Sequence, residues 1–398
     1  MRVRTCRAVR TLTDEPGPGT AEGRLAARIT HALGDYGRLD RCWDYGDGRP
    51  RRVRVPASSH GAVVLMGRSY ADVLFILRHR DLSISRDYAI GGVSEQDDAG
   101  LLRRPDGRVR EVINPLWNVR ASAQYRDRIR AIARARAGEI RGGGVIDLAS
   151  AFAAPFVHAL TAYLCGLEDG EAAALRALSD RTTGMLLSAS GDHLTAHAAW
   201  ADLYEYSRPL IRRARKGGNS LMSATIRRMD DAGIAPAELE RTIPTGHNGF
   251  GTMYPALLRI LIRLLGSPHL LEHCRSDPQA VPAVMRDIMI SDAHFTFGLP
   301  GLLTKAMRSG GRVVPAGTPV FPNIHAAHTD PSRPPRGHLG WGSGSHGCLG
   351  QWVGRLALEE AVHAVAGLPE LAPAGRDWLP RAWSEGTMPV PRYVLVAA

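Results

Sequence analysis

The chain lacks several features that would place it in a specialised class. Of its 398 residues only 5 are cysteine and 6% are aromatic. The cysteines are widely scattered with no Cys-x-x-Cys pair, which excludes both a disulfide framework and a four-ligand zinc site. No apolar run reaches the roughly eighteen residues of a membrane-spanning helix, and the first residues lack the apolar core of a secretory signal. We therefore expect a cytoplasmic protein with no membrane partner.

Lysine is nearly absent, yet the chain is basic. Its net charge is +11, and Lys216 and Lys305 are its only lysines, so arginine carries almost all of the positive charge. The arginines are spread along the whole length and are not interleaved with aromatic residues, so we expect no nucleic-acid partner. Two interpretations remain: an arginine-rich surface without a specific role, or attraction of an acidic substrate or electron-carrier protein.

Hydrophobic periodicity indicates a mostly helical chain with short strands near both ends. Apolar residues recur at helical spacing in segments 70–77, 125–140, 146–164, 171–187, 193–215, 256–265 and 350–365. Segments 60–67 and 392–396 are typical of strands, and 312–321 predicts a tight hairpin. Segment 83–107 reads as a loop. We expect residues 1–398 to form a single, mainly α domain with small β-sheets.

A glycine-rich loop precedes the last predicted helix and contains a cysteine. It reads Trp341-Gly-Ser-Gly-Ser-His346-Gly-Cys348-Leu-Gly350. A thiol just before a helix N-terminus is favoured as the thiolate by the helix dipole and the free N–H groups. The glycines allow the backbone to approach a flat ligand and to donate N–H groups to the sulfur. Such a thiolate is a good ligand for haem iron; the alternative is a buried structural cysteine after an accidental turn.

The loop resembles the signature F-G-x-G-x-H-x-C-x-G of the cytochrome P450 superfamily. The matching positions are Gly342, Gly344, His346, Cys348 and Gly350, with Trp341 replacing phenylalanine. Segments 70–78, 108–117, 313–317 and 326–331 resemble further family stretches in the same order. The resemblance implies the cytochrome P450 fold, with haem b (iron protoporphyrin IX) between a distal helix and the cysteine loop. It also implies Cys348 as the iron ligand and His346 and Arg110 at the haem propionates.

The chain departs from the family at the distal helix. There the family has A-G-x-D/E-T-T, whose acid and alcohol deliver protons to bound dioxygen, whereas residues 245–250 read Thr-Gly-His-Asn-Gly-Phe. Asn248 cannot ionise and Gly249 has no hydroxyl, so this relay is missing as written. His247 or Thr252 could replace it near Asn248, although a lone histidine is more often a packed polar side chain. The glycines and Pro255 predict a kinked or opened helix.

Other family positions differ as well. The E-x-x-R pair falls at Arg286 and Met289, so its buried salt bridge cannot form, although such a pair can be replaced at little cost in stability. Further departures are Asp106 for a propionate-binding histidine, Leu302 or Leu303 for an arginine, and Arg333 or Arg336 as the surviving arginine of a shortened loop. These losses affect the expected chemistry more than the expected fold.

These features favour a haem-thiolate oxidoreductase, of the monooxygenase or oxidase type, in bacterial secondary metabolism. A glycine-opened distal helix leaves room for a bulky peptide or polyketide substrate, and the arginine excess would attract a carboxylate on it. Such a substrate could supply the missing proton, which favours oxidative decarboxylation. A small acidic ferredoxin would supply electrons. The expected substrate contacts are Thr245, Gly249, His294, Phe295 and Phe297, with segments 83–107 and 186–204 also lining the pocket.

Two other hypotheses remain open. In the first, the same scaffold is redox-silent and acts as a cyclase, isomerase or dehydratase, with haem as Lewis acid or structural filler, and the missing proton relay supports this. In the second, a non-catalytic domain recruits or activates a partner enzyme, as the combined loss of the E-x-x-R pair, relay and propionate contacts would allow. For His294, Phe295 and Phe297, core packing is the alternative to substrate contact.

Overall fold

The structure of the chain is a computed structural model, which describes most of residues 107–292 and shorter segments on either side of them. The described residues are 51–54, 63–67, 69–79, 82–83, 107–140, 144–186, 193–292, 301–303, 305–309, 312–314, 316, 319–344, 347–368, 371–375, 378–379 and 393–397. Most of the segment 83–107 that was expected to be a loop therefore lies outside the described residues.

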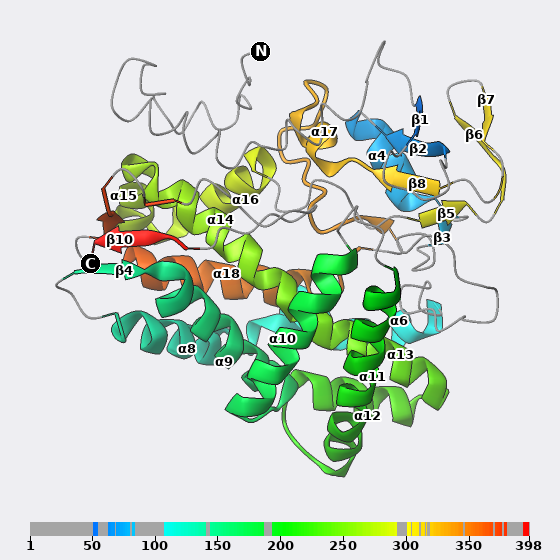
Figure 1. Cartoon of the computed structure of the whole chain (residues 1–398), viewed down its shortest axis with the longest axis horizontal. Helices are drawn as coiled ribbons and strands as arrows, with labels where there is room; N and C mark the ends of the chain where they lie inside the picture. The colour runs from blue at the N-terminus through cyan, green and yellow to red at the C-terminus, as the bar shows by residue number, and fades with distance from the viewer. Residues whose placement is uncertain are drawn as a thin grey trace.

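A five-stranded sheet combines segments from both halves of the chain, at the upper right of Figure 1. Its order is β1 (Arg51–Arg54), β2 (Val63–Gly67), β8 (Pro319–Pro322), β5 (Gly301–Leu303) and β3 (Leu82–Ser83). Strands β2 and β8 are parallel, and the other pairs are antiparallel. Helix α4 (Tyr70–Arg78) packs on β2 and β8 and begins at a capping box formed by Ser69 and Asp72.

The hairpin expected over 312–321 is wrong. Strand β7 (Arg312–Val314) pairs with β6 (Met307–Ser309), which precedes it, whereas β8 pairs with β2 and β5 in the larger sheet. The Pro-Ala-Gly segment therefore connects two sheets. Apolar residues on both sides of a turn indicate two strands, but local pattern does not decide which partner each strand takes.

Helices make up most of the described chain, as expected. They are α6 (Gly107–Trp117), α7 (Val119–Ala123), α8 (Arg126–Gly138), α9 (Ala154–Cys165), α10 (Asp169–Leu186), α11 (His193–Lys216), α12 (Leu221–Asp231), α13 (Pro236–Gly249), α14 (Met253–Leu265), α15 (Pro268–Ser276), α16 (Val281–Ser291), α17 (Ile324–Thr329) and α18 (Gln351–Ala366), with 3-10 turns η2 (Phe250–Thr252) and η3 (Pro278–Ala280). Within the described part, no single helix has the length and hydrophobicity to cross a membrane, although the bent pair Ala149–Cys165 and Gly170–Thr182 meets that test jointly.

The segment 146–164 is only partly helical. It begins as strand β4 (Val145–Asp147), passes through a π-helical turn η1 (Ala149–Ala153), and then continues as α9. The Asp147 carboxylate explains the difference, because it accepts the N–H groups of Ala149 and Val394. This contact holds β4 in a small sheet with β10 (Leu395–Ala397) and β9 (Ala372–Pro373).

Helices α14 and α18 form the centre of the molecule (Figure 1). Both bury residues on nearly every side, which is typical of helices enclosed by other helices. One charged residue inside α14 is neutralised locally: Arg259 Nη1 lies 2.6 Å from Asp292 Oδ1, and both side chains are buried. The last central helix, α18, begins directly after the cysteine-containing loop, so packing around α18 also positions that loop.

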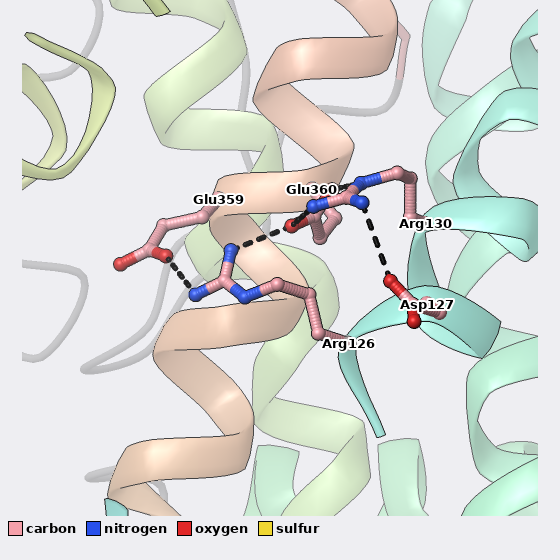
Figure 2. A network of polar contacts seen from close by, with 5 residues as sticks. All are labelled: Arg126, Asp127, Arg130, Glu359 and Glu360. Atoms are coloured by element: carbon pink, nitrogen blue, oxygen red, sulfur yellow. Dashed lines mark hydrogen bonds and ion pairs between the residues drawn. The ribbon is translucent and has the colours of Figure 1, made fainter. Parts of the chain in front are cut away.

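A charged network attaches α8 to α18 (Figure 2). Glu360, whose side chain is 1% exposed, accepts Arg126 Nη1 at 2.7 Å and Arg130 Nε at 2.9 Å. Arg126 also reaches Glu359 at 3.3 Å, and Arg130 reaches Asp127 at 3.3 Å. Two guanidinium groups therefore compensate one buried carboxylate, and the pair of helices is joined by charge as well as by apolar packing.

Candidate functional site

The glycine-rich loop closes on itself through backbone hydrogen bonds. The N–H of Cys348 donates to the carbonyl of Trp341 at 2.7 Å, and the N–H of Gly347 donates to that of Gly344 at 3.1 Å. Gly342 and Gly344 have φ of 70° and 67°, the left-handed region that side chains with a Cβ rarely adopt. The two glycines therefore allow the chain to turn back so that Cys348 lies just before α18.

The loop is also fixed against the end of α4. A Cβ added to Gly344 would lie 3.0 Å from both Arg78 Cα and the Leu77 carbonyl oxygen, and backbone atoms cannot easily move aside. Arg78 Nε donates to Ser343 Oγ at 3.0 Å. The small β region thus supports the loop from one side while α18 continues from its other end.

Cys348 is a free cysteine and an exposed residue. Desolvation by the surrounding protein atoms raises the pKa of its thiol, while the N–H of Gly350 and the charge of Arg110 act in the opposite direction. Arg110, from α6, donates to the carbonyl of Gly347. The free thiol is therefore protonated at neutral pH, and binding of a metal cation is what would convert it to the thiolate.

The residues present fit a thiolate-ligated haem. The donor is an exposed thiol, and Gly350 beside it adds no side chain, although a Cβ there would make only ordinary contacts, 3.8 Å from Cys348 Sγ and 3.9 Å from the Trp117 ring. Trp341 packs back onto α18, where a Cβ on Gly354 would come within 3.0 Å of its ring. Arg110 supplies a half-buried cation close to the sulfur. Asp106 and His346 lie outside the described residues.

The two residues at the positions of the E-x-x-R pair, Arg286 and Met289, make other contacts. Met289 is buried in the core, and Arg286 Nε lies 3.1 Å from Asp287, its own neighbour in α16. In the shortened loop after Asp330, Arg333 is buried. Its Nε donates to the carbonyl of His328 at 3.1 Å, and its Nη1 donates to that of Gly337 at 2.9 Å. Through these bonds to several carbonyls, the guanidinium of Arg333 holds the shortened loop, so no carboxylate of α16 is needed as its partner. Of the two arginines considered for this loop, Arg336 is exposed.

The expected interruption of the distal helix is confirmed. Helix α13 ends at Gly249, the 3-10 turn η2 follows, and the chain returns to α-helix at Met253. Thr252 Oγ1 donates to the carbonyl of Gly249 at 2.7 Å, which satisfies an acceptor at the break. Thr245 is half-buried and Gly249 is exposed on this segment.

Two side chains of this segment have contacts that the sequence did not suggest. His247 Nδ1 lies 3.0 Å from Ser207 Oγ in α11, and Asn248 Oδ1 accepts Thr182 Oγ1 of α10 at 2.5 Å. Burial lowers the pKa of His247 to about 4, so its imidazole is neutral at pH 7. His247 is thus a packed polar side chain, and the Asn248 carboxamide bonds to α10. The assignment of His247, Asn248 and Thr252 as catalytic residues stays a prediction.

The remaining expected contacts have different outcomes. His294, Phe295 and Phe297 lie outside the described residues, so their assignment to the substrate stays a prediction. Sequence reasoning missed two small hydroxyl residues, Thr182 on α10 and Ser207 on α11, that contact the segment 245–252. A serine or threonine on a helix usually bonds its own backbone, and nothing in the local pattern of these helices indicates a partner in α13.

An open groove of about 960 Å³ lies between α8, α15 and α18. Its charged lining consists of Arg126, Arg130, Arg134, Arg275, Glu359 and Glu360. Arg275 already donates to the carbonyls of Ala366 and Leu368 at the end of α18. The groove is therefore a basic surface on the same helix that begins at the cysteine loop, and it is distinct from the loop itself.

No family model matches the chain, but curated proteins and solved structures do. The chain is 26% identical over 272 residues to cytochrome P450 107B1 of Saccharopolyspora erythraea, covering 64% of this chain and 65% of that protein, just under two thirds of its length. It is 25% identical over 342 residues to nocardicin C N-oxygenase of Nocardia uniformis, covering 78% and 82%. The structure of P450BioI with a fatty-acyl-loaded acyl carrier protein superposes with a TM-score of 0.76 at 16% identity, covering 93% and 99%.

Proposed function

We propose that the chain is a haem-thiolate oxidase of the cytochrome P450 superfamily, in which Cys348 would hold the iron of haem b. The observation that supports this most directly is the exposed thiol of Cys348, presented by a glycine loop at the start of α18 beside Arg110. Bound haem would supply the activation of dioxygen. The chain's own contribution is to hold the sulfur, exclude competing ligands and orient the substrate.

The loop residues have separable roles in this proposal. Donation from the N–H of Gly350 to the sulfur stabilises the thiolate and reduces its basicity. Arg110 keeps a positive charge close to the sulfur and to the expected propionate side. The carbonyl of Trp341 accepts the N–H of Cys348 and its ring packs on α18, so Trp341 fixes the position of Cys348 relative to α18.

The test is spectroscopic and uses the purified full chain supplied with hemin. The wild type should give the red-shifted Soret band of a thiolate-ligated ferrous carbon monoxide complex. Cys348→Ala should abolish it, and Cys348→His should replace it with an imidazole-ligated spectrum. Cys274→Ala is the control, because Cys274 is buried and its thiol pKa is raised to about 11. A chain that refuses hemin, or a Cys348→Ala protein with an unchanged spectrum, contradicts the proposal.

We propose that the substrate, rather than a side chain of the distal segment, supplies the proton that the reaction with dioxygen requires. In the described distal segment His247 and Asn248 are bonded to α11 and α10, and Gly249 has no side chain. A carboxylate-bearing peptide or polyketide could hold the required proton or an ordered water itself. Oxidative decarboxylation is the outcome we favour, because it places that carboxylate beside the metal. If so, Asn248→Asp with Gly249→Thr should change the rate little, and a large gain would count against this reading.

We also propose an acidic ferredoxin-type protein as electron donor. Trp352 is 38% exposed on the first turn of α18, with the guanidinium carbon of Arg355 5.4 Å from its ring centroid. An exposed tryptophan next to arginine is a composition enriched where proteins bind partners. The net charge of +11 favours an acidic partner. Reduction by an acidic ferredoxin should slow as salt rises, and more steeply in the wild type than in Arg355→Gln.

A second candidate is a redox-silent cyclase, isomerase or dehydratase on the same scaffold. The occupied side chains of His247 and Asn248 favour it, because a reaction without dioxygen needs no distal proton relay. Turnover in the absence of air and reductant would establish this function. Dependence of turnover on both would support the oxidase.

A further inference from the structure

Helices α10 and α11 are attached to the distal helix at three neighbouring positions. Thr182 and Ser207 make the polar contacts with Asn248 and His247. One turn away, Gly251 of η2 lies so close to α10 that an added Cβ would be 2.8 Å from Ser179 Cβ. Figure 1 shows α10, α11 and α13 side by side, and these three helices contact one another directly.

The attachment is entirely internal. The side chains of Thr182, Ser207, His247 and Asn248 all belong to residues that are at least nine-tenths buried. Separating the helices at this level would leave hydroxyl, carboxamide and imidazole groups without their partners, which is unfavourable in a water-excluded interior. The contact therefore favours one fixed spacing between the α10–α11 pair and the distal helix.

Thr182 is the member whose contact is most specific. Its hydroxyl has a single proton to donate, and the acceptors within reach are Asn248 Oδ1 at 2.5 Å and the carbonyls of Ser179 and Leu178 at 3.0 and 3.1 Å. A threonine hydroxyl on a helix often bonds only its own backbone. The shorter distance to Asn248 directs the proton across to α13 instead.

We propose that Thr182 and Ser207 are positioning residues of the distal site. By bonding the consecutive residues Asn248 and His247, they hold both side chains towards α10 and α11 and keep this helix pair seated on the distal helix. The distal helix then offers no imidazole and no carboxamide to a bound substrate. The consequence of this attachment for catalysis rests on the proposed haem-thiolate function, whereas the attachment itself does not depend on that function.

The first experiment measures the attachment without haem. Thr182→Val keeps the shape of threonine and removes the hydroxyl, and Ser207→Ala does the same on α11. Amide hydrogen exchange in α10 and α11, followed by mass spectrometry, should become about tenfold faster, the factor expected for one net hydrogen bond. Thr182→Ser should restore the wild-type rate.

Thr161→Val is the matched control for this experiment. Thr161 is a buried threonine on α9, and its hydroxyl donates only to the carbonyl of Val157 in the same helix at 2.7 Å. Exchange in α10 that is no faster in Thr182→Val than in Thr161→Val would overturn the proposal. A loss of helicity in Thr182→Val that is absent from Thr182→Ser and from Thr161→Val would support it, because of these three only Thr182→Val lacks the hydroxyl that bonds Asn248.

The second experiment uses the hemin-loaded chain and imidazole as a small distal ligand. If the attached helices restrict access, imidazole should bind several-fold faster to Thr182→Val and to Ser207→Ala than to the wild type, while Thr161→Val matches the wild type. Equal rates in all four proteins would refute the positioning role at the distal site. A chain that does not take up hemin but shows the exchange effect would refute the proposed function and leave the attachment intact.

Discussion

The network around Glu360 should respond very differently to removal of its acid and removal of its bases. Glu360 is 1% exposed, whereas the side chains of Arg126 and Arg130 are 41% and 39% exposed. The carboxylate is the buried partner, and the two guanidinium groups can still reach water. Both changes remove the two ion pairs of Glu360. The double arginine change also removes the longer contacts of Arg126 with Glu359 and of Arg130 with Asp127, both at 3.3 Å and made by half-exposed arginines, which contribute little.

Removing the acid leaves only half-exposed cations. In Glu360→Gln the amide oxygen can still accept one bond, and the unpaired guanidinium charge is hydrated and screened, so we expect a loss of about 1 kcal/mol. Removing both bases leaves a carboxylate enclosed by protein. For Arg126→Met with Arg130→Met, in which the aliphatic stems stay packed, we expect a loss of about 4 kcal/mol.

Urea denaturation followed by far-ultraviolet circular dichroism measures both free energies, because urea does not screen charge. The triple variant, which combines both arginine changes with Glu360→Gln, should recover most of the loss, since it no longer buries an unpaired charge. Arg136→Met is the control, because the ion pair of Arg136 among the described residues is with the exposed Glu139, directly after α8. If Glu360→Gln destabilises as much as the double arginine variant, burial of the carboxylate does not determine the cost.

Three further outcomes can be checked. Gly251→Ala should destabilise the chain because its Cβ meets Ser179, whereas Gly249→Ala, which meets nothing within 4 Å, should not, and adding Ser179→Gly should rescue Gly251→Ala in the same urea assay. His247 has a folded pKa of about 4 against 6.5 unfolded, so its contribution is present above pH 6.5 and is lost as pH falls towards 4. That loss is at most about 3 kcal/mol, and it should be missing from the stability–pH curve of His247→Gln. Arg333→Gln should weaken hemin uptake, measured by titration, because the loop below Cys348 loses its buried organiser.

The sequence predicted the elements whose cause is local. The glycine and cysteine spacing of 341–350 predicted the turn and the helix that follows, because φ values above zero and helix initiation depend on residues a few positions apart. The same holds for the break after Gly249, which glycine and proline impose on a helix. Membership of the family was also readable from that short motif and the order of the weaker ones.

Tertiary contacts decided what short-range pattern leaves open. Strand β8 pairs with β2, more than 250 positions earlier in the chain, although its own turn suggested β7 as partner. Asn248 stands at the acid position of the family's A-G-x-D/E-T-T stretch and His247 directly before it, yet partners on α10 and α11 hold both side chains as packing contacts. Arg333 and Glu360 likewise acquire their roles from groups that lie far away in sequence or in a folded loop. Composition and periodicity specify which side chains can bond, but the partner of a buried polar group is chosen only when helices pack, because that is when water is excluded and each donor must find an acceptor.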